Sequence, residues 1–315
     1  MNRHRRKAYL ALLTTALIWG LAPPIIKYTL RFISPLTFLF YRFLIVSTIL
    51  FIPLIWKIKK EKLNLKKSFQ YLALGFLGTP LTLLFLFYGM QKTAAINASL
   101  ISIFTPLLII LGGVVFLKET VTRQERLGIS FIFGGALLSV IEPIFKNGVN
   151  LSQGLTGNLL ILAGSLAWAS FSLLRRKVGE RLDSFILSAS SFLVGLVIVT
   201  LAMAIVNPAQ IFHFSLFAFN LNALPGVFYM AILGSVIAYF TYIYGFSKIE
   251  ASEATLFTYL EPVFAIPIAV FFLQEKPSSL FLLGAFLIVV GVLASQTRKL
   301  KLPRLLIFET KRGRP

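Results

Sequence analysis

The stretch 243–296, IYGFSKIEASEATLFTYLEPVFAIPIAVFFLQEKPSSLFLLGAFLIVVGVLASQ, decides the fold of this chain. It holds two apolar spans joined by the short polar turn 274–276, and the earlier stretch 87–140 repeats it without a gap at an offset of 156 residues. The residues that recur in register are Tyr88, Gly89, Lys92, Ala98, Leu100, Pro106, Leu117, Glu119, Gly128 and Gly135, matched by Tyr244, Gly245, Lys248, Ala254, Leu256, Pro262, Leu273, Glu275, Gly284 and Gly291. Apolar composition would match many Leu and Ile, but not a Lys, a Pro, a Glu and three Gly. The chain therefore contains a duplicated membrane unit.

Composition places the chain in a lipid bilayer. Of its 315 residues 57% are hydrophobic and only 13% are charged, so there is too little polar surface to cover a soluble core of this size. A formal net charge of +20 would suggest nucleic acid as the partner of a soluble protein. Here the Lys and Arg lie between the apolar spans, where they set the topology, and we expect no nucleic-acid partner.

The residue inventory argues against an enzyme. The chain has no Cys, and its two His, His4 and His213, lie outside the apolar spans. The lack of Cys excludes disulfides and thiolate metal sites. The lack of His within the spans leaves intramembrane catalysis without its usual ligands and bases. No Walker, Rossmann or serine-hydrolase motif is present, so we expect no cofactor. The energy for any transport would come from a proton or ion gradient, or from a partner subunit.

Ten spans are long enough to cross a bilayer, which needs about 20 apolar residues. They are 8–30, 35–56, 69–91, 94–117, 125–143, 155–174, 184–206, 222–246, 251–273 and 278–297. The short turns between them favour an all-α integral membrane fold of ten transmembrane helices. The first five-helix repeat occupies 8–143 and the second occupies 155–297, followed by the basic tail 298–315.

The placement of Lys and Arg predicts the orientation. With both termini in the cytoplasm, the inner segments 57–68, 175–183 and 298–315 carry many of the basic residues. We therefore expect a multi-pass protein of the cell (inner) membrane. Five spans per half then make the two repeats inverted. The aromatic-rich outer loop 207–221 is read as an interfacial belt in preference to a lid.

Two prolines and one carboxylate fall inside the spans. Pro106 and Pro262 lie at matching places in the two halves, where a proline frees the carbonyl four residues back and kinks the helix. Matching kinks point to a cavity between the halves near the middle of the bilayer. Glu261 beside Pro262 is an acidic residue near mid-bilayer, where an unpaired charge is costly. It is either a site for a proton or a substrate cation, or a structural hydrogen-bonding group.

A pocket for a small amphipathic molecule is predicted from aromatic and polar residues within the spans. Trp19 and Trp168 match at an offset of 149 residues and lie near the centres of their spans. The polar and aromatic residues expected to line the pocket with them are Asn97, Ser99, Ser102, Tyr239, Tyr242, Thr258 and Glu261. Plain helix packing is the alternative for each aromatic residue.

Other residues have two readings each. Arg42 could bind a substrate carboxylate or phosphate, or pair across helices, and Lys27 is expected to snorkel toward the outer surface. Glu119 and Glu275 are expected to pair with a cation or cap a neighbouring helix. The Gly128/Gly135 and Gly284/Gly291 faces allow close approach to neighbouring helices or to a second copy in a homodimer.

Together these residues resemble the EamA family of the drug/metabolite transporter superfamily. The resemblance rests on the duplication, on Trp19-Gly20 followed by Lys27, on Pro35 with Arg42, and on the run 260–265 leading to 273–275. It covers roughly residues 8 to 296. It implies a ten-helix inverted-repeat carrier that moves small metabolites by alternating access, often exporting amino acids or related compounds, and that uses no cofactor.

The leading hypothesis is thus a secondary transporter that exports a small metabolite. A flippase for a lipid-linked head group is the alternative, and it would give Arg42 more weight than Glu261. A membrane enzyme is disfavoured because the spans lack His, Cys and paired carboxylates.

Overall fold

The computed structural model describes residues 3–61, 63–118, 123–147, 153–178, 182–206, 220–246, 248–249 and 257–296. Within them all regular secondary structure is helical, as the sequence predicts. The basic tail 298–315, Glu119 and almost all of the loop 207–221 lie outside the described residues, so the expectations for them stay predictions.

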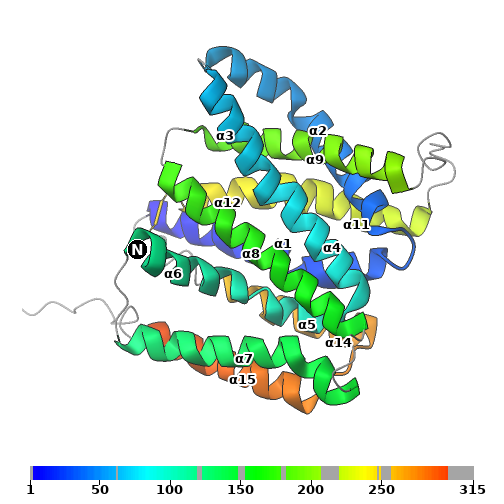
Figure 1. Cartoon of the computed structure of the whole chain (residues 1–315), viewed down its shortest axis with the longest axis vertical. Coiled ribbons are helices and arrows are strands. Elements are labelled where there is room, and N and C mark those ends of the chain that lie inside the picture. The colour runs from blue at the N-terminus through cyan, green and yellow to red at the C-terminus, as the bar shows by residue number, and fades with distance from the viewer. Residues whose placement is uncertain are drawn as a thin grey trace, which may run out of the picture.

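The helices follow one another along the chain with short connections. In order they are α1 (Arg3–Thr29), α2 (Pro35–Lys60), α3 (Leu65–Phe76), η1 (Leu77–Leu81), α4 (Thr82–Lys92), α5 (Ala95–Ile101), α6 (Phe104–Leu117), α7 (Arg123–Asn147), α8 (Gln153–Val178), α9 (Ser184–Val206), η4 (Leu221–Ala223), α11 (Leu224–Phe228), η5 (Tyr229–Ile237), α12 (Ala238–Phe246), α14 (Glu261–Leu273) and α15 (Ser279–Gln296). Figure 1 shows them packed side by side as a bundle.

Eight helical stretches of the described chain are long and apolar enough to cross a membrane. They are Arg5–Thr29, Pro35–Lys60, Leu65–Lys92, Ala95–Phe116, Arg123–Phe145, Gly154–Arg175, Ser184–Val206 and Leu221–Tyr242. They coincide with the first eight spans predicted from the sequence. The ninth and tenth predicted spans are represented by the shorter apolar helices Glu261–Leu273 and Ser279–Ala294. The chain is a multi-pass membrane protein.

Near both prolines the structure interrupts the helix, where the sequence predicted kinks. Helix α5 ends at Ile101 and α6 begins at Phe104, two residues before Pro106. In the second half the backbone turns at residues 259–260, and α14 begins at Glu261, directly before Pro262. Because proline has no N–H to donate, the carbonyl four residues back loses its usual partner. The Ser102 carbonyl instead accepts from the Thr105 N–H at 3.0 Å.

Two π-helical segments also lie at corresponding places. Segment η1 (Leu77–Leu81) contains Pro80 and interrupts the third span, whereas η5 (Tyr229–Ile237) interrupts the eighth. The triplet 77–79, Leu-Gly-Thr, corresponds at the offset of 156 residues to 233–235, Leu-Gly-Ser. Such segments widen the helix locally, redirect its side chains, and often occur at functional sites.

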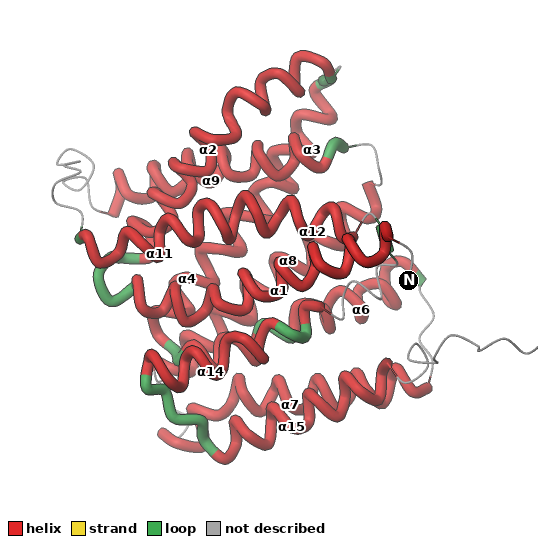
Figure 2. The backbone as a smooth tube through the Cα atoms, turned by 180° about the vertical axis from the view of Figure 1, so that it is seen from behind, coloured by secondary structure: helices red, strands yellow, loops and turns green. Residues whose placement is uncertain are grey.

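Helices α7 and α15 form a close pair at one edge of the bundle (Figures 1 and 2). A Cβ added at Gly284 would lie 2.7 Å from the Gly135 carbonyl oxygen, and one at Gly291 would lie 2.6 Å from the Gly128 carbonyl oxygen. Only glycine allows two backbones to approach this closely. The two glycine faces predicted to meet a neighbouring helix or a second copy therefore contact each other within one chain.

Two charged side chains hold the junction of α4 and α5. The Glu275 carboxylate accepts hydrogen bonds from the Ala95 N–H at 2.8 Å and from the Ile96 N–H at 2.9 Å, which caps the start of α5 as predicted. The Lys27 ammonium donates to the carbonyls of Met90 at 2.9 Å and Thr93 at 2.5 Å, at the end of α4. Lys27 was expected to snorkel toward the outer surface, and in the structure its ammonium is half-buried at this junction, bound to the carbonyls at the end of α4.

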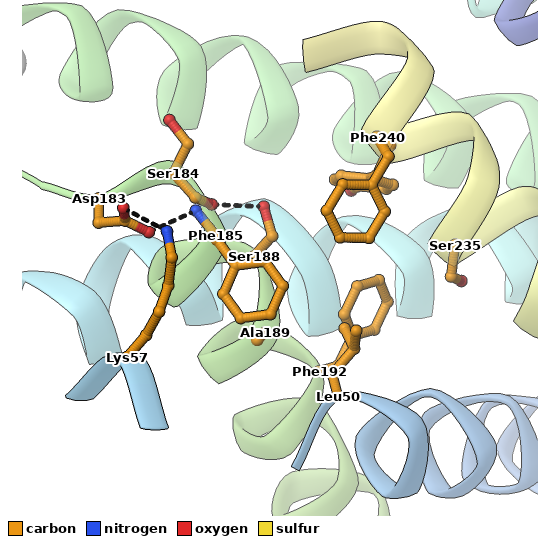
Figure 3. A pocket seen from close by; sticks show the side chains of 11 residues that line it. Leu50, Lys57, Asp183, Ser184, Phe185, Ser188, Ala189, Phe192, Ser235 and Phe240 are labelled. Atoms are coloured by element: carbon orange, nitrogen blue, oxygen red, sulfur yellow. Dashed lines mark hydrogen bonds and ion pairs between the residues drawn. The ribbon is translucent and has the colours of Figure 1, made fainter. Parts of the chain in front are cut away.

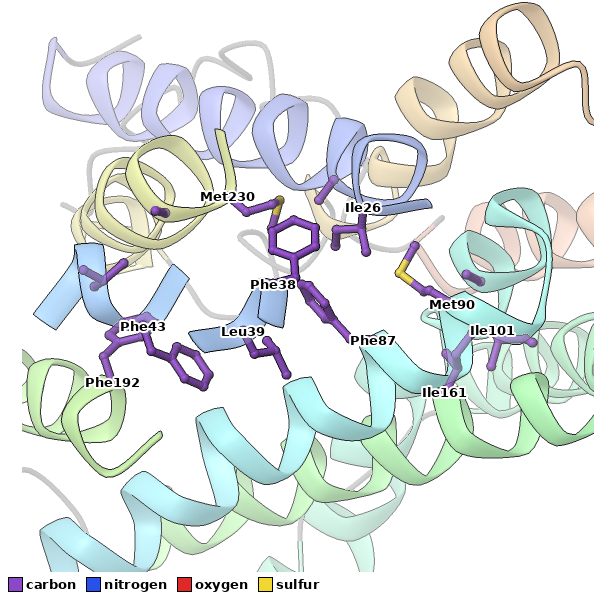
Figure 4. Close-up of a cluster of buried hydrophobic side chains, with 14 of the residues drawn as sticks. Ile26, Phe38, Leu39, Phe43, Phe87, Met90, Ile101, Ile161, Phe192 and Met230 are labelled. Carbon is purple, nitrogen blue, oxygen red and sulfur yellow. The ribbon is translucent and has the colours of Figure 1, made fainter. Parts of the chain in front are cut away.

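Large aromatic residues fill the core between the helices (Figure 4). Phe38 and Phe87 pack edge to face with ring centroids 4.9 Å apart, and Phe43 contacts Phe192 at 6.0 Å. All four are almost completely buried. This cluster joins α2 to α4 and α9, and so fixes the walls of the site described next.

Candidate functional site

A cavity of about 270 Å³ lies between α2, α9 and the segment formed by η5 and α12. Its walls mix aromatic, aliphatic and hydroxyl side chains with one ion pair. The lining residues are Leu50, Lys57, Asp183, Ser184, Phe185, Ser188, Ala189, Phe192, Ser235, Tyr239 and Phe240. Figure 3 shows Lys57 and Asp183 at one end of this set and Ser235 at the other. A mostly apolar wall with a few polar groups is typical of sites for small organic ligands.

The Lys57–Asp183 end of the cavity is held by a hydrogen-bonded ion pair of 2.6 Å. The second Asp183 oxygen accepts from the N–H groups of Phe185 and Ile186, both at 2.9 Å, and so caps the start of α9. Burial alone would raise the pKa of Asp183, but the Lys57 ammonium and these backbone donors together lower it. The carboxylate is thus fixed in its charged form beside the Lys57 ammonium.

At the other end Ser235 and Tyr239 line the cavity, and Arg42 lies directly behind Ser235. The Arg42 Nε donates to the Ser235 hydroxyl oxygen at 2.9 Å, and that hydroxyl donates to the Met230 carbonyl at 2.9 Å. The Met230 carbonyl is five residues back, as the π-helical turn of η5 requires. The guanidinium also lies over the Phe87 ring, 5.8 Å from its centroid. The Thr79 side chain of η1 lies beside the Tyr239 hydroxyl.

The structure brings together the aromatic residues predicted to form the pocket. The Trp19 ring lies 5.7 Å from Tyr239 and 5.2 Å from Tyr242, and the Trp168 ring lies 6.3 Å from Tyr239. The Trp19 indole N–H donates to the Gly234 carbonyl at 3.0 Å. Tyr239 is therefore the centre of an aromatic cluster with Trp19 and Trp168, one from each half of the chain, and of this cluster Tyr239 reaches the cavity wall.

The predicted polar residues of the fourth span do not line this cavity. Ser99 and Ser102 donate to the carbonyls of Ala95 and Ala98, both at 2.8 Å, so their hydroxyls turn back onto α5. The Asn97 Oδ1 is buried without a hydrogen-bond partner among the described residues. Thr258 lies at the break before α14. These residues stay predictions for a site, at a place separate from the cavity.

Glu261 begins α14 and lies against α1. A Cβ added at Gly20, next to Trp19, would lie 2.7 Å from the Glu261 carbonyl oxygen, so the two backbones touch there. In the described part of the chain the Glu261 carboxyl group makes neither a hydrogen bond nor an ion pair. The structure thus places the Glu261 backbone against Gly20 of α1, and Glu261 lies outside the lining of the cavity.

Sequence reasoning missed Ser235 and gave Thr79 no role. Both follow a Leu-Gly pair, and they match each other at the offset of 156 residues found for the stretches 87–140 and 243–296. Extending that alignment back by ten residues would have found them. The Lys57–Asp183 pair carries no such pattern, because its members belong to different spans and only the packing of α2 against α9 brings them together.

The side chains that line the cavity offer aromatic contact, hydroxyl hydrogen bonds and a cationic donor, the Lys57 ammonium. Among the described residues, no group of three or more His, Cys, Asp or Glu could hold a metal ion.

Comparison with known proteins agrees with this picture. Residues 6–141 and 155–296 each match the model of the EamA-like transporter family. An uncharacterized transporter of Archaeoglobus fulgidus is 27% identical over 289 residues, which cover 91% of this chain and 96% of that protein. The uncharacterized transporter YyaM of Bacillus subtilis is 29% identical over 290 residues, covering 91% and 92%. A crystal structure with 18% sequence identity shares the fold, with a TM-score of 0.65 over 94% of this chain and 99% of that chain.

Proposed function

Because this chain belongs to the EamA-like transporter family, we propose that it is a secondary transporter that moves a small amphipathic metabolite, such as an amino acid or a related compound, out of the cell by alternating access. The observation that carries this proposal is the cavity that runs between α2, α9 and η5 to Ser235 and Tyr239. Such a cavity within a membrane-spanning bundle lets a ligand leave one aqueous side without entering lipid.

Symmetry between the halves supports the alternating-access mechanism. At the offset of 156 residues Gly128 corresponds to Gly284, and Gly135 corresponds to Gly291. The observed contacts pair Gly135 with Gly284 and Gly128 with Gly291, so exchanging the halves maps one contact onto the other. This is the relation expected of two inverted five-helix repeats, which rock against each other around a central site.

The distribution of basic residues gives the direction of the opening. The cavity ends at Lys57 and Asp183, in the segments 57–68 and 175–183 that the positive-inside rule assigns to the cytoplasm. Figures 1 and 2 draw the start of α1 and the end of α15 at the same end of the bundle, in line with both termini on that side. We therefore describe this conformation as the cytoplasm-facing state of an inner-membrane exporter.

Glu261 is the candidate for coupling to a proton gradient. A carboxyl group within the membrane-spanning region, without an ion-pair partner in the described chain, can bind and release a proton as the halves move. Its contact with α1 beside Trp19 gives a route by which protonation could affect the aromatic cluster.

The proposal is tested by metabolite profiling of medium and cells at matched expression. We would compare the wild type with Ser188→Trp, which fills the cavity, and with Val197→Trp, which adds the same side chain on α9 at a position 59% exposed toward lipid. We expect a few small metabolites to accumulate in the medium with the wild type and with Val197→Trp, and to be lost with Ser188→Trp.

Export that Ser188→Trp leaves unchanged would refute the cavity as the route. No soluble difference between wild type and empty cells would refute export and favour flipping of a lipid-linked head group. Coupling is tested with Glu261→Gln and the conservative Glu261→Asp. If Glu261→Gln exports at the wild-type rate and pH profile, Glu261 has no coupling role.

A further inference from the structure

Arg42 is a buried cation without an anion. Its side chain is 3% exposed and lies within the membrane-spanning stretch Pro35–Lys60. Its contacts are the Ser235 hydroxyl at Nε and the face of Phe87, and Nη1 has no hydrogen-bond partner. No carboxylate of the described residues pairs with it. A charge buried in this way is costly unless a partner of opposite charge arrives, and the described chain provides none.

The position of Arg42 tells where that partner would come from. Ser235, to which Arg42 donates, lines the inner end of the cavity together with Tyr239. A ligand that reaches this end meets the Ser235 side chain, whose oxygen accepts from Arg42 and whose proton is donated to the Met230 carbonyl, so the guanidinium behind it is the donor that remains for an anion. A guanidinium presents planar donors that match the two oxygens of a carboxylate better than an ammonium does. Arg42 does not line the cavity itself, but it lies one side chain behind the end wall, where its unpaired guanidinium suits an oxyanion.

The remaining walls define the rest of the ligand. Phe192, Tyr239 and Phe240 line the cavity and give flat apolar surface on α9 and α12. Aromatic side chains favour stacked or edge-on contact with a flat, apolar group. At the far end the Lys57 ammonium, although paired with Asp183, adds a second cation along the path.

We propose that the cavity binds a small organic acid with a flat apolar body, its carboxylate paired with Arg42 at the Ser235 end and its body against Tyr239, Phe192 and Phe240. This inference rests on the proposed transport function, because it names the substrate class of the same cavity. It assigns Arg42 as the binding residue and Ser235 as the residue that positions its guanidinium at the end of the cavity.

The test measures binding to the purified full-length protein by calorimetry. The probes are phenylacetate and indole-3-acetate, each compared with its neutral amide, so that body and size stay constant while the charge is removed. We expect each acid to bind about tenfold to a hundredfold more tightly than its amide, which corresponds to a charge-assisted hydrogen bond. Equal affinity of acid and amide, or no binding of either acid, would overturn the proposal.

Variants assign the effect to Arg42. Arg42→Met should remove the preference for the acid, Arg42→Lys should keep part of it, and Ser235→Ala should weaken it. Ser47→Ala is the matched control, because Ser47 is a buried serine on the same helix as Arg42 and lies outside the cavity lining. If Arg42→Met fails to fold, the proposal is still tested by comparing acid and amide binding in the wild type, in Arg42→Lys and in Ser235→Ala. Retained acid preference in a folded Arg42→Met protein would overturn the assignment.

Two further measurements separate this inference from the proposed function. Export of neutral or cationic metabolites only, without acid binding, would leave the transporter standing and reject the organic-acid site. Acid binding without transport of the bound acid into proteoliposomes would reject the transport function and keep the site. Arg42-dependent translocation of an anionic phospholipid, without binding of the soluble acids, would reject the organic-acid site in favour of a lipid head group.

Discussion

Two adjacent glycines on α7 give opposite predictions for the same substitution. A Cβ at Gly135 would overlap the Gly284 carbonyl oxygen and lie 2.9 Å from Ile288 Cγ1 and 3.1 Å from Ile288 N. A Cβ at Gly134 would meet nothing within 4 Å. Gly135→Ala must therefore push α15 away from α7, whereas Gly134→Ala changes only the conformational freedom of the helix.

The size of each effect follows from packing and propensity. Overpacking a close contact costs about 1–3 kcal/mol. If the helices separate instead by about 0.5–1 Å, the atoms that face each other lose about a quarter to a half of their dispersion energy. Replacing Gly by Ala within a helix returns about 0.5–1 kcal/mol. We expect Gly135→Ala to lower the free energy of unfolding by roughly 0.5–2 kcal/mol, from the overpacking cost less this return. Gly134→Ala should raise it by about 0.5–1 kcal/mol.

The assay is reversible unfolding of the purified protein in mixed micelles, followed by circular dichroism with increasing denaturing detergent. Both variants add the same methyl group to the same helix, so effects of detergent and expression are equal in the two and cancel in the comparison. If Gly135→Ala is as stable as Gly134→Ala, then α7 and α15 do not approach through Gly135 and Gly284, and the symmetric contact that supports inverted repeats is lost.

Three further predictions concern charged groups at helix ends. Glu275→Gln should lower the free energy of unfolding by about 1–3 kcal/mol, because Gln is uncharged and offers one acceptor oxygen to the two N–H groups at the start of α5, and unchanged unfolding would contradict the cap. Lys27→Met should destabilise the end of α4 and speed hydrogen exchange of the amides there, whereas a protein that snorkels Lys27 would show no local change. Because the pKa of Asp183 is lower in the folded protein than its ordinary value, its stabilising contribution is present at neutral pH and is lost as the pH falls from about 4 through the folded pKa. Asp183→Asn should therefore flatten the acid side of a stability–pH curve, and a curve identical to that of the wild type would refute the pairing with Lys57.

Much of the fold could be predicted from the sequence, since the relevant forces are local or periodic. The hydrophobic length of each span depends on neighbouring residues only, so the first eight spans were placed correctly. Proline removes a backbone donor from a helix, and the helices are interrupted near the paired prolines Pro106 and Pro262, whereas α1, α2 and α7 continue through theirs. Glu275 was expected to pair with a cation or to cap a neighbouring helix, and the structure selects the cap.

The candidate site could be predicted only in part. Trp19 and Trp168 were identified by their depth within the spans, and they meet Tyr239 in space, with Tyr242 beside Trp19, as expected of the predicted pocket. The hydroxyls of the fourth span were not cavity-lining, because a serine in a helix can bond the carbonyl four residues back, as Ser99 does. The sequence does not distinguish a serine whose hydroxyl bonds its own helix backbone from a serine whose hydroxyl faces a ligand.

By itself the sequence determined that this protein lies in a membrane, that its chain is duplicated, and near which prolines its helices are interrupted. Only the tertiary structure decided which helix faces meet, for example that Arg42 donates to Ser235, 193 residues further along the chain. The physical reason is that lipid is as apolar as the outer face of a helix, so hydrophobicity fixes the depth of a span but not its neighbours or its rotation. Those are set by close backbone approach and by a few buried polar contacts, which form only when the whole bundle is assembled.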